Sequence, residues 1–174
     1  AEQRNAAGGV QGRKLELLVQ DSGMSPDTAR TAMQALLDAK VDAVVGPFSS
    51  FAAVAVLPMA NQAGVVLVSP NATASELAGQ DDQMLMLSTS TRDATRAYAE
   101  RLWQRGHRRM AVATSVEARN AVFYKAWRDE FKAAFRALGG EILPGADFTA
   151  DAELAYQQVV ANLLVGQPDG VMLV

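Results

Sequence analysis

The stretch that decides the fold runs from Val41 to Leu77 and reads VDAVVGPFSSFAAVAVLPMANQAGVVLVSPNATASEL. Two short apolar runs within it, Val41–Val45 and Val65–Val68, lack polar alternation, which is typical of parallel strands buried on both faces. The residues between them, Phe51–Gln62, are rich in helix formers, and a stop glycine, Gly64, follows. The stretch therefore predicts a strand, a helix and a second, parallel strand.

Each apolar run ends in a small polar loop, with Ser49 and Ser50 after the first run and Asn71 and Thr73 after the second. The carboxyl ends of consecutive parallel strands meet at one edge of the sheet, where open α/β folds bind ligands. A helix that starts there offers unpaired backbone N–H groups and the positive end of its dipole. Two interpretations stay open at this point. The hydroxyl residues cap helices, which is their commonest use, or the edge binds a carboxylate or a similar anion.

Composition narrows the classes of protein to consider. The chain has 174 residues, of which 49% are hydrophobic and 20% charged, as in soluble globular proteins of one domain or two small lobes. A net charge of −3 with scattered Lys and Arg argues against nucleic acid as a partner. The absence of cysteine excludes disulfides, thiolate metal sites and cysteine catalysis within this chain.

The amino-terminal residues read like the last turn of a helix, because Ala1–Ala7 lead into a glycine stop. Such an opening suggests a fragment or a processed chain, so the missing targeting signal carries no information about location. No apolar run approaches the roughly 18 residues of a membrane helix, and we expect no membrane span in this chain.

Local signals predict further elements. Strands are expected at Lys14–Gln20, Met110–Ala113, Glu141–Leu143 and Gly170–Val174, and Met84 and Met86 are expected in the core. Ser25-Pro26-Asp27 is typical of a helix start. Apolar residues at helical spacing predict helices after Ser25, from Ala94 to Leu102, from Arg119 to Leu138 and from Ala152 to Val165.

A weak internal repeat suggests two lobes. A double glycine, a strand, a helix and an aspartate before an apolar strand occur twice, starting at Gly8 and at Gly139. Two similar α/β lobes, joined near Ser88–Thr91, would produce this pattern. We therefore expect a first lobe at residues 1–88 and a second at residues 89–174.

Catalytic and cofactor motifs are missing from the sequence. There is no G-x-G-x-x-G after a strand and no phosphate-binding G-x-x-x-x-G-K-[ST] motif. The single histidine, His107, lies at a helix end just before a strand, where a surface cation is the usual interpretation. No residue resembles a nucleophile with its base. The sequence thus argues against an enzyme and indicates no cofactor and no metal site.

Several segments carry a resemblance to a known family: GGVQGRKLELLVQDS, KVDAVVGPFSS, ANQAGVVLVSPNATASEL, GHRRMAVATS, LGGEILPGADF and QPDGVMLV. In this order they resemble type I periplasmic binding proteins, most closely the branch that binds leucine, isoleucine, valine and related amino acids for ABC importers. The resemblance covers nearly the whole chain, and G-P-x-S-S and S-P-x-A-T stand at the right separation.

The resemblance implies a fold and a site. In that family two Rossmann-like lobes with parallel sheets, joined by hinge crossings, close over the ligand. By position, Ser50 would hold the ligand carboxylate through its hydroxyl and N–H, Asn71 would offer backbone contacts, and Thr73 would offer its hydroxyl and N–H. The ligand-binding residues implied in this way are Ser49, Ser50, Asn71, Ala72, Thr73 and Arg119.

The chain departs from the family pattern at three places. Arg119-Asn120 stand where the family has Tyr-Gly, whose ring covers the ligand. Leu87-Ser88-Thr89 replace Phe-Arg-Thr at the crossing between the lobes, and Arg96 replaces a common Gln. These departures favour a different or more anionic ligand.

The resemblance also implies that both lobes are incomplete. The family's first strand, central in the first lobe, is missing, as are the later second-lobe elements with the acidic group that pairs with the ligand amine. Lys14–Gln20 and Val41–Val45 would then lack the strand between them. Because unpaired buried backbone groups are costly, we expect this gap to be filled by residues of a longer chain, by a strand from a neighbouring molecule, or by direct pairing in altered order.

The expected function is that of a periplasmic or otherwise extracytoplasmic solute-binding protein of an ABC importer. Its partners would be an amino acid or similar carboxylate and a membrane permease. The alternative is a sensor or regulatory module of the same fold, such as a receptor ectodomain or an activator of a cell-wall synthase. An enzyme ranks third, because no catalytic constellation is present.

Overall fold

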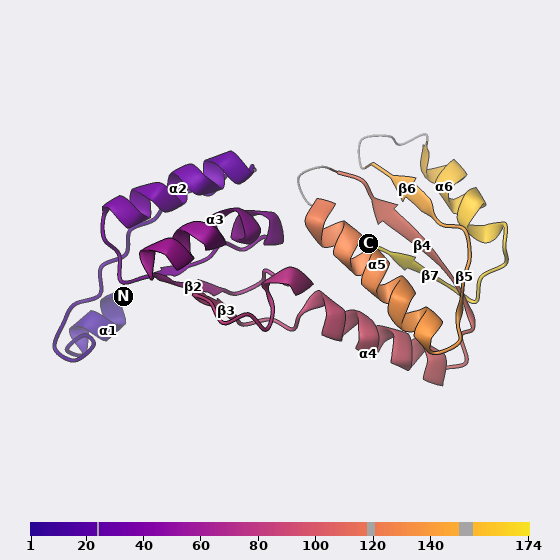
Figure 1. The fold of residues 1–174 in the computed structure, drawn as a ribbon, viewed down its shortest axis with the longest axis horizontal. Helices are drawn as coiled ribbons and strands as arrows, with labels where there is room; N and C mark the ends of the chain where they lie inside the picture. Colours follow the sequence, from indigo (N-terminus) through magenta and orange to yellow (C-terminus); the bar gives the residue numbers. More distant parts are fainter. Residues whose placement is uncertain (24, 118–120, 150–154) are drawn as a thin grey trace.

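The computed structural model describes residues 1–23, 25–117, 121–149 and 155–174. It has helices and two separate parallel sheets, which confirms the expected α/β class (Figure 1). In chain order the elements are α1 (Glu2–Ala6), α2 (Pro26–Asp38), β1 (Ala43–Val45), α3 (Ser50–Ala63), β2 (Val66–Ser69), a 3-10 turn (Ser75–Leu77), β3 (Met84–Met86), α4 (Thr91–Gln104), β4 (Arg109–Ser115), α5 (Ala121–Ala137), β5 (Glu141–Ile142), β6 (Ala146–Phe148), α6 (Ala155–Leu164) and β7 (Gly170–Leu173).

The first sheet has the strand order β1-β2-β3, all parallel. Its helices α2 and α3 lie together on one side of the strands (Figure 1). Val44, Leu67 and Met84 stand side by side in the register and pack under α3, against Val56 and Ala60. The core of this half is therefore a single layer of side chains between the sheet and the two helices.

The second sheet is built around β4, which pairs in parallel with β5, β6 and β7. Phe131 and Phe135 of α5 are fully buried against Met110 and Val112, which point to one face of β4. The other face of the same strand, at Ala111, packs with Leu163 of α6. Helices thus cover this sheet on both faces.

The chain passes from one sheet to the other between β3 and α4. Val122, in the first turn of α5, also packs against the core of the first sheet, so the two halves touch. The division into lobes at residue 88 stays a prediction.

Most predicted strands and helices are confirmed with shifted ends, and Gly64 ends α3 in the left-handed conformation that its position requires (φ 66°). The sequence analysis missed β6, whose three residues, Ala146–Phe148, are too short to show a period. The first residues of the two helices predicted from Arg119 and Ala152 lie outside the described residues.

The strand predicted at Lys14–Gln20 is wrong. These residues are extended but pair with no strand, and Leu17 and Val19 are exposed. A groove of about 470 Å³ separates residues 16–20 from β1. An apolar segment becomes a strand only where a neighbour pairs its backbone, and within the described residues β1 pairs only with β2. Direct pairing of the two segments is therefore wrong as well; filling of the groove from outside residues 1–174 stays a prediction.

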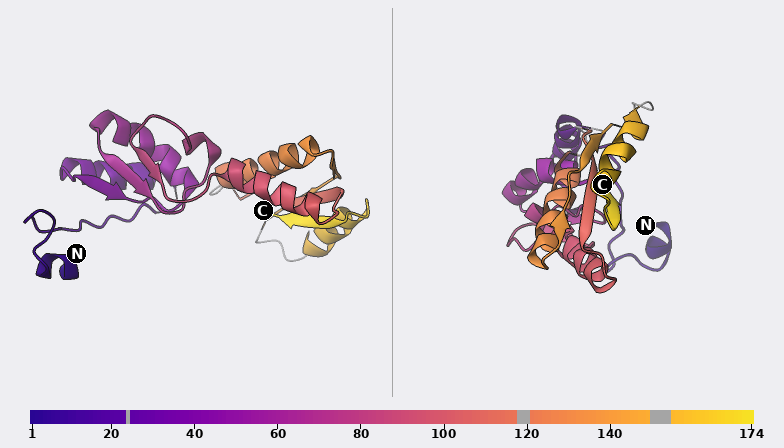
Figure 2. Two further views of the ribbon diagram at one scale, coloured as in Figure 1. Left: turned by 90° about the horizontal axis from the view of Figure 1, so that it is seen from below. Right: turned by 90° about the vertical axis from the view of Figure 1, so that its right-hand side faces the viewer.

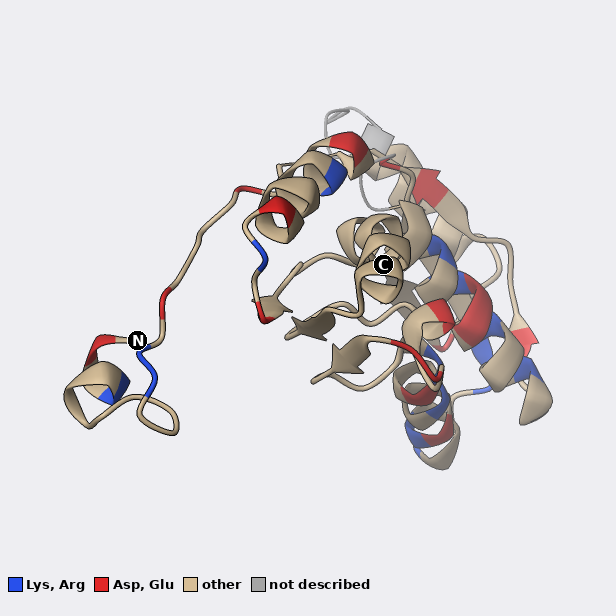
Figure 3. Ribbon diagram, turned by 60° about the vertical axis from the view of Figure 1, so that its left-hand side comes forward, with Lys and Arg blue, Asp and Glu red and all other residues tan. Residues whose placement is uncertain are grey.

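The helix α1 lies apart from both halves, at the end of this extended segment (Figures 2 and 3). The Asn5 side chain holds it there, because its amide donates to the Leu15 carbonyl at 2.8 Å and its oxygen accepts from the Leu15 N–H at 2.7 Å. The helical turn and the glycine stop expected at the amino terminus are confirmed, since α1 ends at Ala6 and Gly8 has a positive φ of 96°.

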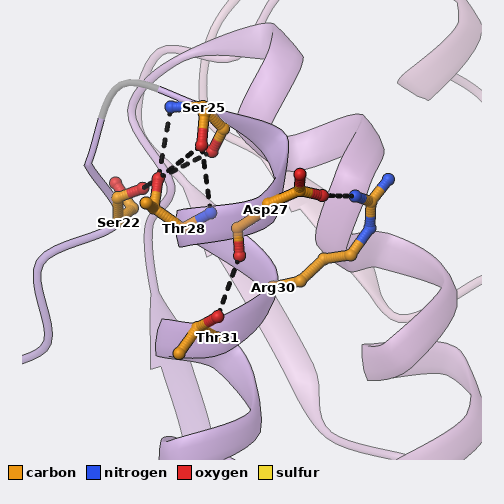
Figure 4. Close-up of polar contacts among 6 residues, drawn as sticks. All are labelled: Ser22, Ser25, Asp27, Thr28, Arg30 and Thr31. Carbon is orange, nitrogen blue, oxygen red and sulfur yellow. Dashed lines mark hydrogen bonds and ion pairs between the residues drawn. The ribbon is translucent and has the colours of Figure 1, made fainter.

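The start of α2 is a capping box, as Figure 4 shows. The Thr28 N–H donates to Ser25 Oγ at 3.1 Å, and the Ser25 N–H donates to Thr28 Oγ1 at 3.2 Å. Thr28 Oγ1 also donates to the Ser22 carbonyl, at 2.9 Å. The cap matters because α2 buries Ala29 and Met33 in the core of the first half.

We expect Ser25→Ala to lower the free energy of unfolding of the complete protein by about 1 kcal/mol, because the Thr28 N–H loses its acceptor. Urea denaturation followed by circular dichroism measures the loss. Ser22→Ala is the matched control, since it keeps the backbone carbonyl that Thr28 uses. Equal losses in the two variants would show that the cap contributes nothing.

One carboxylate joins the start of β4 to the residue just before β7. The backbone N–H groups of Arg108 and Arg109 donate to Asp169 Oδ2 at 2.6 and 2.8 Å. These hydrogen bonds, that of Arg108 first, hold the pKa of Asp169 below its ordinary value. The aspartate expected before the last strand therefore joins that strand to the central one.

This pairing predicts a pH dependence of stability. Because the pKa is lowered in the fold, ionised Asp169 stabilises the fold above the ordinary aspartate pKa of about 3.9, and the contribution is lost as the pH falls through the folded pKa. The difference in melting temperature between the parent and Asp169→Asn should be largest near neutral pH and shrink below about pH 4. Asp81→Asn controls for the change in net charge. A difference that stays constant down to pH 2 would contradict the prediction.

Candidate functional site

Three loops meet at the carboxyl edge of the first sheet, one after each strand. The loop after β1 enters α3, the loop after β2 leads into the 3-10 turn at Ser75–Leu77, and the loop after β3 enters α4. The parallel register of the three strands places these loops side by side. Sequence analysis expected the first two loops at one edge, and this is confirmed.

Ser50 joins the first loop to the second. It is only 3% exposed, and the backbone N–H groups of Thr73 and Ala74 donate to its Oγ at 3.2 and 3.3 Å. A hydroxyl oxygen has two lone pairs and one proton. Both lone pairs are engaged, so the hydroxyl can still donate only its proton.

Ser69, at the end of β2, forms hydrogen bonds to the same two loops. Its hydroxyl donates to the Pro47 carbonyl at 2.6 Å and accepts from the Ala72 N–H at 3.0 Å. Both Ser69 and Ala72 are fully buried. The position of the second loop is therefore set by hydroxyl-to-backbone bonds rather than by side-chain packing alone.

Thr73 connects the second loop to the third. Its carbonyl accepts from the Thr91 N–H at 2.7 Å, and its Oγ1 accepts from Thr91 Oγ1 at 3.2 Å. Thr91, the first residue of α4, is fully buried. As with Ser50, the Thr73 hydroxyl accepts a bond inside the protein and keeps its own proton to donate.

The first N–H groups of α3 lack a capping side chain. The N-cap residue, Ser49, makes no side-chain capping bond, and the first N–H group of this region that donates to the backbone is that of Ala53, to the Ser49 carbonyl at 3.0 Å. The N–H groups of residues 50–52 thus have no acceptor among the described residues at the positive end of the helix dipole, and Ser50 and Ala52 are themselves buried. The site collects backbone and hydroxyl donors and has no carboxylate among the residues named here, so it suits a negatively charged group.

The structure thus brings Ser49, Ser50, Ala72 and Thr73 together at one edge. Asn71 lies in the same loop with its side chain exposed. Arg119 lies outside the described residues. Whether these residues bind the ligand stays a prediction.

Sequence analysis missed the bridging residues. Ser69 and Thr91 are buried hydroxyl residues that hold the loops in place, and Ser88 adds a bond from its hydroxyl to the Pro70 carbonyl at 2.6 Å. The available signal was the hydroxyl-rich run at residues 88–91, which was interpreted as the junction between the two lobes. Its role depends on partners 18 residues earlier in the chain.

Neither a metal-binding cluster nor a membrane-spanning helix is found among the described residues. They contain no group of three or more His, Asp or Glu residues placed to hold a metal ion. None of their helices has the length and apolar character needed to cross a membrane.

The profile of the family described as periplasmic binding protein matches residues 1–174. The chain belongs to this family. A curated relative, an amino acid binding protein of Pseudomonas aeruginosa, is 32% identical over 95 residues, which cover 48% of this chain and 25% of the relative.

Solved structures of this family share the fold. An ABC transporter substrate-binding protein of Desulfitobacterium hafniense, in complex with Leu, is 26% identical with a TM-score of 0.76 over 99% of this chain and 50% of its own. The branched-chain amino acid binding protein LivJ of Streptococcus pneumoniae, in complex with isoleucine, is 24% identical with a TM-score of 0.81 over 99% of this chain and 48% of its own. This periplasmic binding protein chain therefore spans about half the length of these solved relatives.

Proposed function

We propose that the chain is part of an extracytoplasmic solute-binding protein of an ABC importer, and that it binds the carboxylate of an amino-acid-like molecule. One observation carries the proposal. The uncapped N–H groups at the start of α3 lie at the same sheet edge as the Ser50 and Thr73 hydroxyls, which accept hydrogen bonds inside the protein and keep their own protons. The relative from Desulfitobacterium, crystallised with Leu, supports the amino-acid class of ligand.

Binding of this kind breaks no covalent bond. The carboxylate would exchange its hydration water for backbone and hydroxyl donors that are already fixed in place, so little ordering remains to be done when the ligand arrives. The part of the protein outside residues 1–174 would supply the group that pairs with the ligand amine. A membrane permease would then receive the loaded protein.

A second candidate function is sensing. The departures at Leu87-Ser88-Thr89 and at Arg96 favour it, because a sensor of this fold need not keep the ligand positions of the importers. In the structure Arg96 pairs with Asp93 of its own helix at 2.8 Å. Permease and ATPase genes beside the gene would support transport, whereas fusion to a kinase, a channel or a DNA-binding domain would support sensing.

Titration of the complete protein with leucine, leucinamide and 4-methylpentanoate tests the proposed contact. The last of these keeps the carboxylate and lacks the amine. Leucinamide keeps the side chain and amine but lacks the carboxylate. We expect it to bind at least tenfold more weakly than leucine, since one charge-assisted hydrogen bond contributes about 1.5 kcal/mol or more. If leucine does not bind, other carboxylates are compared with their amides in the same way. An amide that binds as well as its carboxylate would overturn the proposal.

A further inference from the structure

Arg92, in the first turn of α4, contacts both halves of the protein. Its backbone N–H donates to Ser75 Oγ at 2.9 Å, in the loop after β2. Its side-chain Nε lies 3.5 Å from Oε2 of Glu130, on the helix α5 that packs on the second sheet. One residue is thus bonded through its backbone to the first half and through its side chain to the second.

The loop that Arg92 contacts is the one that carries Thr73 in the candidate site. Thr91, the residue before Arg92, is bonded to Thr73 by its N–H at 2.7 Å and by its hydroxyl at 3.2 Å. Ser75 is only 8% exposed, so the bond to its hydroxyl lies inside the protein. Three hydrogen bonds therefore fix the first turn of α4 to this loop.

The rest of α4 belongs to the second half. Ala99 is fully buried in the same core as Phe131 and Phe135 of α5, and Trp103 meets the edge of Phe135 with the ring centroids 6.2 Å apart. The helix contains no Pro or Gly, the residues at which sharp kinks usually occur. A rotation of the second half is therefore transmitted along α4 to its first turn.

Arg96 shows that an arginine on this helix need not join two elements. It lies one turn after Arg92, and its side chain is 62% exposed, against 68% for Arg92. It pairs with Asp93 of its own helix at 2.8 Å. The Arg92 pair, in contrast, joins α4 to α5, at the end of α4 that is bonded to the first half.

We propose that a junction made of Ser75, Arg92 and Glu130 restricts the relative orientation of the two halves and links it to the position of the loop that carries Thr73. The hydrogen bond to Ser75 fixes the first turn of α4 to the loop, and the ion pair with Glu130 fixes the same turn to α5. The inference concerns the protein without a bound molecule, so it does not depend on the proposed ligand.

The test measures geometry, because an ion pair as exposed as this one adds little to stability. Spin labels at Ala35→Cys in α2 and Gln157→Cys in α6, both exposed positions, report the distance between the halves of the complete protein, from which any other cysteine has been replaced. Double electron–electron resonance without ligand gives the distance distribution. Ser75→Ala and Arg92→Met should each widen this distribution, because each removes one bond of the junction.

Two matched variants serve as controls. Arg96→Met removes the same charge one turn away, and Ser75→Thr keeps the hydroxyl, so both should retain the distribution of the parent. Hydrogen exchange gives a second readout: in Ser75→Ala the Arg92 amide should exchange at least about tenfold faster than in the parent, since its acceptor is lost.

Circular dichroism verifies that each variant is folded. A distribution as narrow as that of the parent in either Ser75→Ala or Arg92→Met would overturn the inference, and so would equal widening in Arg96→Met. Failure of leucine to bind leaves these distances unchanged, so the junction and the proposed ligand are tested separately.

Discussion

Changing Ser50 to Ala together with Thr73 to Val should weaken ligand binding of the complete protein by roughly 2–5 kcal/mol, at about 1.5–3 kcal/mol for each charge-assisted bond with incomplete additivity. The physical reason is that both hydroxyls keep a proton for the ligand, since Ser50 Oγ accepts two hydrogen bonds inside the protein and Thr73 Oγ1 accepts one. Titration calorimetry measures the affinity. The backbone donors at the start of α3 remain, so residual binding is expected.

The matched control is the double variant Ser22→Ala and Thr31→Val, which makes the same chemical changes on and before α2, away from the site. Ser50→Ala also leaves the Thr73 and Ala74 N–H groups without their acceptor. The stability of each variant is therefore measured beside its affinity. A double variant that is folded and binds with unchanged affinity would reduce Ser50 and Thr73 to structural residues.

Phe135→Ala should lower the free energy of unfolding of the complete protein by about 3–5 kcal/mol, because it removes a large side chain from a close-packed core. Phe135 is fully buried, stacks on Phe131 with the ring centroids 5.8 Å apart, and meets the edge of Trp103 at 6.2 Å. These contacts hold α5 and α4 on the second sheet. Urea denaturation followed by circular dichroism measures the loss.

Phe135→Leu is the conservative control and should cost only about 1–2 kcal/mol, because Leu refills most of the space. A loss below this range for Phe135→Ala would mean that the core collapses around the cavity or that this half unfolds separately from the rest. The slope of the unfolding curve separates these cases, since it reports the surface exposed in the transition.

Local patterns in the sequence were enough for most elements. Three local features were confirmed: the capping residues Ser25 and Pro26, the stop at Gly64 and the apolar spacing along α5. Each depends on neighbours within a few residues. Parallel strands at Val44 and Leu67 were predicted from their continuous apolar runs and are confirmed, but the burial on both faces that such runs predict is not seen, since Val45 is 84% exposed within the described residues. The fold class followed from these elements in order.

The remaining features depended on contacts between residues that are distant in the sequence. Lys14–Gln20 has the composition of a strand and yet is none, because a strand depends on a partner that can lie anywhere in the protein, and no strand of the described residues pairs with it. Gly140 shows the same limit. It was noted in the sequence as part of the repeated double glycine, and the structure adds that a side chain there would clash with the Phe135 ring.

The candidate site also depends partly on local sequence and partly on tertiary structure. The sequence by itself determined that Ser49, Ser50 and Thr73 follow adjacent parallel strands, because strand order and direction place such loops at one edge. Only the tertiary structure decided what the hydroxyls do there, since Ser50 meets Thr73 across 23 residues and Thr73 meets Thr91 across 18. A hydroxyl can cap, bridge or bind with the same composition around it, and the choice depends on which donors and acceptors the fold brings within 3.5 Å.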